Sequence, residues 1–157
     1  MEDIGLDFLR ENKISGLILD IDNTLVRFGA TEPSESTRAW LESLKKADIK
    51  MVLLSNGLQK RRLATSKNLG IALVSSLLPK PFPYGFQKAV KFLGVPSENI
   101  CAVGDIVFTD ILGANLVGVR TILVEPLSGR EFFGTKFWRF LERVLNLRRP
   151  RRIRAKV

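Results

Sequence analysis

The sequence predicts a single α/β domain in which a mostly parallel sheet lies between two layers of helices, a three-layer Rossmann-like architecture. Its 157 residues suit one domain. A chain of this length buries roughly 70% of the surface that it exposes when unfolded. Short apolar runs of strand type alternate with segments of helical periodicity, and the connections between them are short. This alternation is typical of βα units, whose strands run parallel.

Five short apolar runs have the composition of strands. Residues 17–21 are continuously apolar except for Asp20, as expected for a parallel strand that is buried on both faces. Residues 49–54 have the same character and end at Ser55-Asn56-Gly57, a turn sequence. The five predicted strands are residues 17–21, 49–54, 71–74, 100–103 and 119–124.

Five segments have helical signals, one before the first run and one between each pair of successive runs. Ser34 follows Pro33 and offers an N-cap, and Trp40, Leu41 and Leu44 follow it at helical spacing. A glycine stands directly after three of the other segments, where glycine commonly ends a helix. The five predicted helices are residues 3–13, 34–47, 58–69, 85–93 and 109–117.

The net charge of +9 is concentrated at the C-terminus. Residues 129–157 carry ten Lys or Arg and two acids, a net charge of +8, whereas residues 1–128 carry fifteen basic and fourteen acidic residues. Within this tail, residues 131–147 place Phe137, Phe140 and other apolar side chains on one side of a helix and basic side chains on the other. We therefore expect a core, residues 1–128, and a basic amphipathic helix and tail, residues 129–157, packed on the core or appended to it.

The composition excludes several kinds of catalytic site. The sequence has no histidine, which rules out Ser-His-Asp and Cys-His triads, and its one cysteine, Cys101, makes a structural zinc site very unfavourable. Catalysis must therefore use carboxylates, lysines, hydroxyls and backbone amides, a set that suits a hard cation such as Mg²⁺. Cys101 cannot form an internal disulfide, so no oxidising compartment is required.

Polar residues collect where the predicted strands end. The carboxyl ends of parallel strands share one edge of the sheet, so these residues are expected to form one site. A carboxylate nucleophile with a second carboxyl as acid/base and a magnesium ion is a known arrangement for phosphoryl transfer through an aspartyl-phosphate. Several carboxylates at one edge repel each other and call for a divalent cation. The residues concerned are Asp20, Asp22, Asn23, Thr24, Ser55, Asn56, Lys80, Asp105, Thr109 and Asp110.

Four motifs in this set resemble those of the haloacid dehalogenase (HAD) superfamily, in the same order. They are Asp20-Ile21-Asp22-Asn23-Thr24, Ser55-Asn56, Lys80-Pro81 and Gly104-Asp105-x-x-x-Thr109-Asp110. Each motif alone is a weak signal, whereas the ordered set is a strong one, and together the motifs span roughly residues 17–125.

The resemblance implies a role for each matched residue. Asp20 would attack phosphorus and Asp22 would act as general acid/base, which favours a phosphatase over a dehalogenase. Lys80 would complete the catalytic set and bind the phosphoryl group. Phosphate binding is further expected of Thr24, Ser55 and Asn56. Mg²⁺ would be held by Asp20, the backbone carbonyl of Asp22, and Asp105, and Asp110 would orient a metal-bound water or the lysine.

The intervals between the motifs are too short for a cap domain. Positions 25–54 and 56–79 each have room for one helix and one strand. An uncovered site suits a bulky substrate or a phosphate presented at a surface. The motifs are similar to those of the capless YqeG-like branch of the superfamily, and this likeness implies phosphatidylglycerophosphate, a phospholipid, as substrate.

Several alternatives stay open at this level. The substrate is alternatively the phosphate of a nucleotide, a sugar or a protein, and the basic tail also fits an RNA- or ribosome-associated protein. Lys88 competes with Lys80 for the phosphate, and Asp110 is alternatively a plain acid at a helix start. The apolar side of the tail faces either the core or lipid. We expect a cytoplasmic protein. If its substrate is a lipid, we also expect peripheral attachment to the inner face of the membrane.

Overall fold

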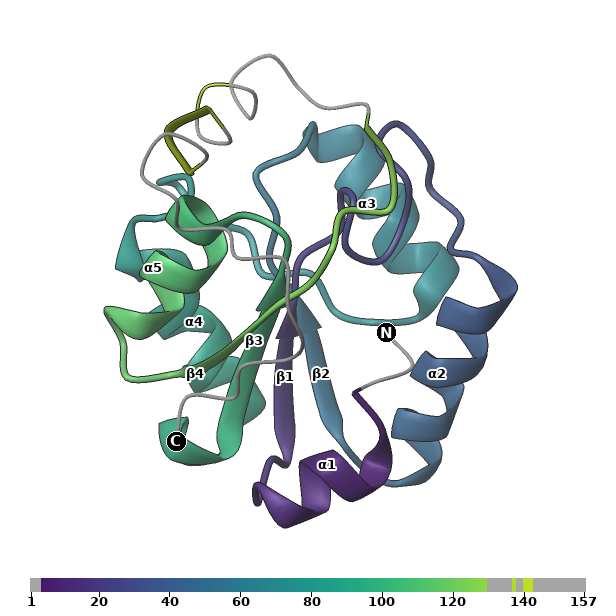
Figure 1. Cartoon of the computed structure of the whole chain (residues 1–157), viewed down its shortest axis with the longest axis vertical. Helices are drawn as coiled ribbons and strands as arrows, with labels where there is room; N and C mark the ends of the chain where they lie inside the picture. Colours follow the sequence, from purple (N-terminus) through teal and green to yellow (C-terminus); the bar gives the residue numbers. More distant parts are fainter. Residues whose placement is uncertain (1–3, 130–136, 138–139, 143–157) are drawn as a thin grey trace.

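A four-stranded parallel sheet forms the middle layer of the computed structural model, which describes residues 4–129, 137 and 140–142 (Figure 1). The strand order is β2-β1-β3-β4. The strands are β1 (Gly16–Leu19), β2 (Lys50–Leu53), β3 (Ile100–Gly104) and β4 (Arg120–Leu123). The α-helices are α1 (Leu6–Glu11), α2 (Glu35–Lys46), α3 (Gln59–Leu69), α4 (Pro83–Leu93) and α5 (Leu112–Asn115).

The helices cover the two faces of the sheet, and β1 supplies core residues to both. Leu17 and Leu19 pack in the cluster that contains the buried side chains of α2, whereas Ile18 packs with those of α4 and α5. This division follows from the alternation of side chains along a strand. Figure 1 shows α2 and α3 on one side of the sheet and α4 and α5 on the other. The predicted α/β fold with a parallel sheet is confirmed.

The register of the strands brings the segments that follow them to one edge. Leu19 at the end of β1 pairs with Leu53 of β2 and with Val103 of β3. Asp20 therefore lies one residue beyond this level, and Ser55 and Asp105 lie two residues beyond it, at the same edge of the sheet. This edge lies at the top of Figure 1, opposite α1.

The predicted strand at residues 71–74 is wrong. In this segment only Leu73 bridges to the sheet, opposite Leu53. The backbone forms two hydrogen bonds, from Leu53 N to the carbonyl of Ala72 and from Val74 N to the carbonyl of Leu53. The chain then leaves the sheet and continues into the loop that carries Lys80. The described residues of this segment therefore form no further strand pairing with β2.

The predicted helix at residues 109–117 also differs. A π-helical turn spans Val107–Ile111 and α5 follows it. The early start has a local cause, because the side chain of Asp110 accepts a hydrogen bond from the backbone N–H of Ile106 (3.0 Å). Such π-helical turns are frequent at functional sites.

The predicted amphipathic helix at residues 131–147 lies mostly outside the described residues. Phe137 and residues 140–142 are helical, and Phe137 and Phe140 are exposed. The buried Glu142 accepts a hydrogen bond from the backbone N–H of Val107 (2.7 Å), just after Asp105. Within the described residues, none of the helices is long and apolar enough to cross a bilayer.

We expect Gly113→Ala to destabilise the fold by about 1–3 kcal/mol, the usual cost of overpacking a tight contact. A Cβ at Gly113 would overlap the ring of Phe86 and would lie 2.9 Å from the carbonyl oxygen of Pro81. Gly5→Ala is the matched control, because nothing lies within 4 Å of a Cβ at that position. Urea unfolding of both variants measures the difference, and equal midpoints would contradict the packing described here.

Candidate active site

A pocket of about 430 Å³ opens at the carboxyl ends of β1, β2 and β3. The structure brings together there every site residue predicted from the sequence except Thr24. Those residues are Asp20, Asp22, Asn23, Ser55, Asn56, Lys80, Asp105, Thr109 and Asp110. Lys88 lies outside the pocket, where its ammonium donates to the carbonyl of Ser75 (2.8 Å).

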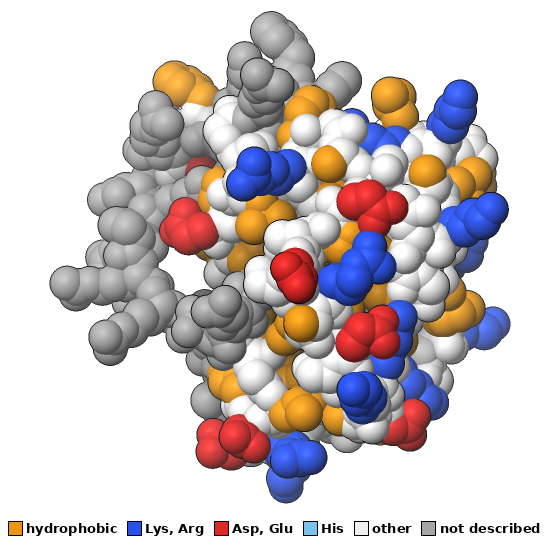
Figure 2. Space-filling model, turned by 90° about the vertical axis from the view of Figure 1, so that its right-hand side faces the viewer, with side chains coloured by type: hydrophobic (Ala, Val, Ile, Leu, Met, Phe, Trp, Pro, Cys, Tyr) orange, Lys and Arg blue, Asp and Glu red, His pale blue; other side chains and the backbone are white. Residues whose placement is uncertain are grey.

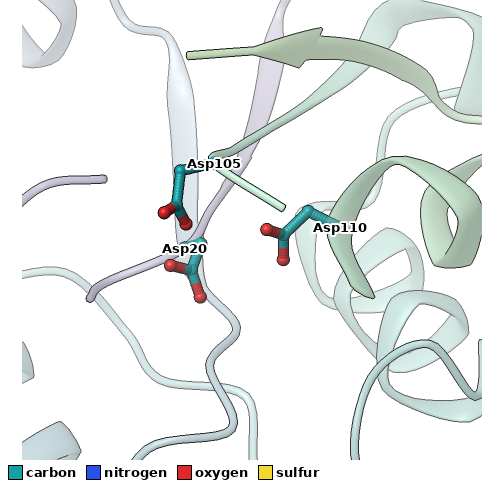
Figure 3. Close-up of side chains that lie close together, drawn as sticks. All are labelled: Asp20, Asp105 and Asp110. Atoms are coloured by element: carbon teal, nitrogen blue, oxygen red, sulfur yellow. The ribbon is translucent and has the colours of Figure 1, made fainter. Parts of the chain in front are cut away.

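The ammonium group of Lys80 lies between two carboxylates at the floor of the pocket. Its Nζ is 2.5 Å from Oδ1 of Asp20 and 2.5 Å from Oδ1 of Asp110. All three side chains are buried, with no more than 10% of any of them exposed. Asp105 completes the cluster, and ligand oxygens of the three acids lie within 4.8 Å of one another (Figure 3).

The cluster holds more negative than positive charge. Burial raises the pKa of Asp20 from 3.8 to about 8; Lys80 opposes this shift, and the charges of Asp110 and Asp105 add to it. Burial alone would lower the pKa of Lys80, but the charges of Asp110 and Asp20 outweigh it and hold that pKa above its usual value. Three carboxylates and one ammonium leave a formal excess of two negative charges.

A close approach to the end of β3 positions Asp110. A Cβ at Gly104 would overlap the Cβ and carboxyl carbon of Asp110, so glycine is required where the two segments meet. The Oδ2 of Asp110 accepts from Ile106 N–H, and its Oδ1 accepts from Lys80. Both oxygens of Asp110 are thus engaged, and the residue holds the lysine in place.

Thr24 does not line the pocket and instead forms a hydrogen bond with Asp105. Its side chain is buried, and its hydroxyl donates to Oδ1 of Asp105 at 3.4 Å. The preceding residue, Asn23, has a positive φ of 61°, which asparagine tolerates better than most residues. The Oδ1 of Asn23 accepts from Phe28 N–H (3.2 Å) and from the hydroxyl of Ser128 (2.6 Å). These bonds tie the loop after β1 to the segment after β4.

Arg61 is a pocket residue that the sequence analysis missed. Its Nη2 donates to Oδ2 of Asp22 at 2.6 Å, and its guanidinium lies 5.0 Å from the centre of the Phe28 ring. The Nε of Arg61 and the Oδ1 of Asp22 are buried without a partner among the described residues. The sequence contains a signal for this contact, namely basic residues in the first turn of α3. Cations are unfavourable at a helix N-terminus unless a carboxylate faces them.

The side chain of Asn56 ties together the two loops that flank the pocket. Its Nδ2 donates to the carbonyl of Lys80 (3.0 Å), and its Oδ1 accepts from the backbone N–H of Lys80 (2.7 Å). The hydroxyl of Ser55 accepts from Gly57 N–H at 3.3 Å, and Arg62 donates to the carbonyl of Ser55 at 2.7 Å. These contacts hold Ser55 and Lys80 on the same side of the pocket.

Comparison with known proteins finds relatives of this chain among hydrolases and phosphatases. The haloacid dehalogenase-like hydrolase family matches residues 26–118. The Bacillus subtilis protein named "Probable phosphatase YqeG" is 35% identical over 135 residues, which cover 86% of this chain and 78% of that protein. The Arabidopsis thaliana protein named "Phosphatidylglycerophosphate phosphatase 1, chloroplastic/mitochondrial" is 29% identical over 137 residues, which cover 82% of this chain and 39% of that protein.

The fold has relatives among solved structures. The crystal structure of a HAD-superfamily hydrolase from Ehrlichia chaffeensis matches with a TM-score of 0.63 at 17% identity, covering 85% of this chain and 98% of that one. At this identity the likeness shows a shared fold. The family match covers more than half of the chain, and the Bacillus relative extends over most of it. The resemblance expected from the four motifs is therefore confirmed, and the chain belongs to the haloacid dehalogenase-like hydrolase family.

Proposed function

We propose that this protein is a Mg²⁺-dependent phosphatase that hydrolyses phosphate monoesters through an aspartyl-phosphate on Asp20. The observation that carries the proposal is the meeting of Asp20, Asp22, Asp105 and Lys80 in one pocket of about 430 Å³. This set includes a buried carboxylate for attack, a second carboxyl for proton transfer, and an ammonium beside the position of the phosphoryl oxygens.

The residues at the floor of the pocket fit Mg²⁺. Mg²⁺ prefers oxygen ligands, and the cluster lacks two positive charges. Asp110 is bound to Lys80 and to Ile106 N–H, so it serves better as the residue that orients Lys80 than as a ligand. Asp20, Asp105 and the backbone carbonyl of Asp22 would hold the ion. Bound there, Mg²⁺ supplies the positive charge that keeps Asp20 ionised and that stabilises the phosphoryl oxygens.

The chain's own residues account for both steps of hydrolysis. In the first, a carboxylate oxygen of Asp20 forms a bond to phosphorus, the ester P–O bond breaks, and Asp22 gives its proton to the leaving oxygen. In the second, Asp22 takes a proton from a water molecule whose oxygen bonds to phosphorus, and the bond between phosphorus and the Asp20 oxygen breaks. Inorganic phosphate leaves, and both carboxyls return to their starting states. Lys80 and Ser55 donate hydrogen bonds to the phosphoryl oxygens, with Asn56 holding Lys80 in place.

The substrate that fits best is phosphatidylglycerophosphate, a phosphate monoester presented on a phospholipid. The name of the Arabidopsis relative supports this choice. The intervals on either side of Ser55 are taken up by α2 and β2 before it and by α3 after it, which leaves the pocket open to a large substrate. An anionic membrane surface is the setting that such a substrate implies.

The full-length protein should hydrolyse phosphatidylglycerophosphate in mixed micelles faster than soluble monoesters of nucleotides, sugars and phosphopeptides. We expect Asp20→Asn to lower kcat by more than about a thousandfold, because it removes the nucleophile. Asp7→Asn, a change at an exposed carboxylate of α1, is the matched control. Phosphate release with and without MgCl₂ measures both effects. Full activity of Asp20→Asn would refute the mechanism, and a preference for a soluble ester would refute the lipid substrate.

The metal-free protein should lose stability as the pH rises from about 4 to about 8. The folded-state pKa of Asp20 is about 8, well above its usual 3.8, so its stabilising contribution is present at low pH and is lost as the pH rises through about 8. Lys80 adds no slope in this range because its pKa is raised from 10.5. Melting temperatures in EDTA should fall less for Asp20→Asn than for the wild type, and MgCl₂ should raise the wild-type value. Parallel curves for the two proteins would contradict this assignment.

Arg61 is proposed as a positioning residue that holds Asp22. Arg61→Ala should lower kcat on a soluble ester by about tenfold or more, because general acid/base catalysis depends on the placement of the carboxyl. Arg61→Lys should restore part of the loss and shift the pH profile of kcat. Lys67→Ala, in the last turn of the same helix, is the control. A change in KM alone would indicate that Arg61 binds substrate without positioning Asp22.

A further inference from the structure

We propose that an apolar rim beside the pocket inserts into the surface of an anionic bilayer and places the pocket over its lipid substrate. This rim is defined as Leu58, Leu77, Leu78 and Phe82. Their exposed fractions are 74%, 91%, 48% and 51%, and all four lie on loops beside the pocket. The inference rests on the proposed function, since it names the surface from which the same pocket draws its substrate.

The rim belongs to the two loops that flank the pocket. Leu58 and Phe82 line the pocket and are exposed to solvent at the same time. The Asn56 amide binds the backbone of Lys80 from the neighbouring loop, so the two loops form one unit. Leu77 and Leu78 lie in the second of these loops, directly before Pro79, which also lines the pocket. An apolar surface that lies beside the site on two joined loops is suited to contact whatever presents the substrate.

Two rim residues occupy positions where local structure favours polar side chains. Leu58 is the N-cap of α3 and Phe82 is the N-cap of α4, and neither helix has a side-chain cap hydrogen bond. Ser, Thr, Asp and Asn are the preferred N-caps, and large apolar residues are among the poorest. Helix stability therefore gives no reason for Leu58 and Phe82, and core packing gives none either, since both are at least half exposed.

The segment that carries the rim contains no acid. From residue 49 to residue 97 the sequence has no Asp or Glu and eight Lys or Arg, which are Lys50, Lys60, Arg61, Arg62, Lys67, Lys80, Lys88 and Lys91. The near-neutral net charge of residues 1–128 therefore hides a strongly basic stretch. Lys60 is exposed two residues after Leu58, and the exposed Lys88 contacts the loop of Leu77 through the carbonyl of Ser75. Basic groups around apolar tips match anionic headgroups above acyl chains.

Figure 2 shows one face of the molecule with the same end at the top as in Figure 1. In Figure 2 hydrophobic and basic side chains stand at the upper edge of the molecule, and the plainly visible acidic side chains lie below it. Because the view is turned about the vertical axis, this upper edge is the edge of the sheet at which the strands end in Figure 1. A bilayer is favoured over a protein partner because every charge in the segment has the same sign and the substrate is itself anionic.

A fluorescent label on the rim tests the proposal in the full chain. Leu77→Cys introduces a thiol at a position that is 91% exposed, whereas Cys101 is 2% exposed and burial raises the pKa of its thiol to about 12. A thiol-reactive, environment-sensitive dye is therefore not expected to label Cys101. Phe92→Cys is the matched control, since Phe92 is 59% exposed but lies at the opposite end of α4 from Phe82.

With vesicles of phosphatidylglycerol and phosphatidylcholine, the dye at position 77 should gain fluorescence about twofold or more, and the dye at position 92 should not change. The double substitution Leu77→Ser/Leu78→Ser should weaken cosedimentation of the unlabelled protein with these vesicles by about tenfold, the effect expected for losing two partly inserted leucines. Its hydrolysis of soluble p-nitrophenyl phosphate should stay unchanged, because neither residue lines the pocket.

Each other outcome overturns the proposal. An unchanged signal at position 77, equal signals at positions 77 and 92, or a signal in pure phosphatidylcholine alone would each exclude docking of this rim on an anionic bilayer. A protein partner would then be the occupant to consider. If the double variant fails to fold, the fluorescence of the labelled Leu77→Cys variant decides whether the rim contacts the bilayer, since that variant carries a single exposed substitution. Hydrolysis of p-nitrophenyl phosphate by the wild type separates failure of the rim from failure of the proposed phosphatase.

Discussion

The buried ion pairs of Lys80 are the interaction on which the site depends. One ammonium group satisfies Asp20 and Asp110 at once, in a place where an unpaired charge would be very costly. Removing one partner of such a pair typically costs about 3–5 kcal/mol, because the remaining charge stays buried. The same contacts leave the carboxyl cluster short of positive charge. A cluster that is incomplete in this way is suited to bind a divalent cation and an anionic phosphoryl group together.

Residues without catalytic chemistry place the reactive ones. The Asn56 side chain binds both backbone groups of Lys80, and Asn23 accepts hydrogen bonds from two separate segments. Gly104 makes room for Asp110 at the end of β3. The Asn56–Lys80 and Asn23–Ser128 contacts join separate loops, whereas Gly104 acts within the segment after β3. The parallel sheet thus supplies the common edge, and the loop contacts supply the exact positions. This explains why short loops are sufficient to build a site that has several charged groups in close contact.

Net charge describes this protein poorly. Residues 1–128 are almost neutral in total, yet all of their acids lie outside residues 49–97. The basic stretch contains Lys80 and Arg61, which pair with acids of the pocket, and it leaves Lys60 and Lys88 exposed beside the rim. Phosphorylated substrates are anionic, and a local excess of positive charge raises their concentration near the pocket. The same excess favours an anionic surface as the place where the substrate is met.

The parallel α/β fold and the four motifs could be predicted from the amino-acid order alone, because apolar runs, glycine and proline signals and motif order are local properties. Two segments differ from the prediction: the run at 71–74 meets the edge of β2 through one bridge only, and the helix expected at 109–117 is a π-helical turn followed by the short α5. The choice of Lys80 over Lys88 for the pocket, the bond of Thr24 to Asp105 and the pairing of Arg61 with Asp22 were decided by the tertiary structure. These contacts join residues that lie far apart along the chain, and they depend on strand order and loop path, which no local pattern encodes.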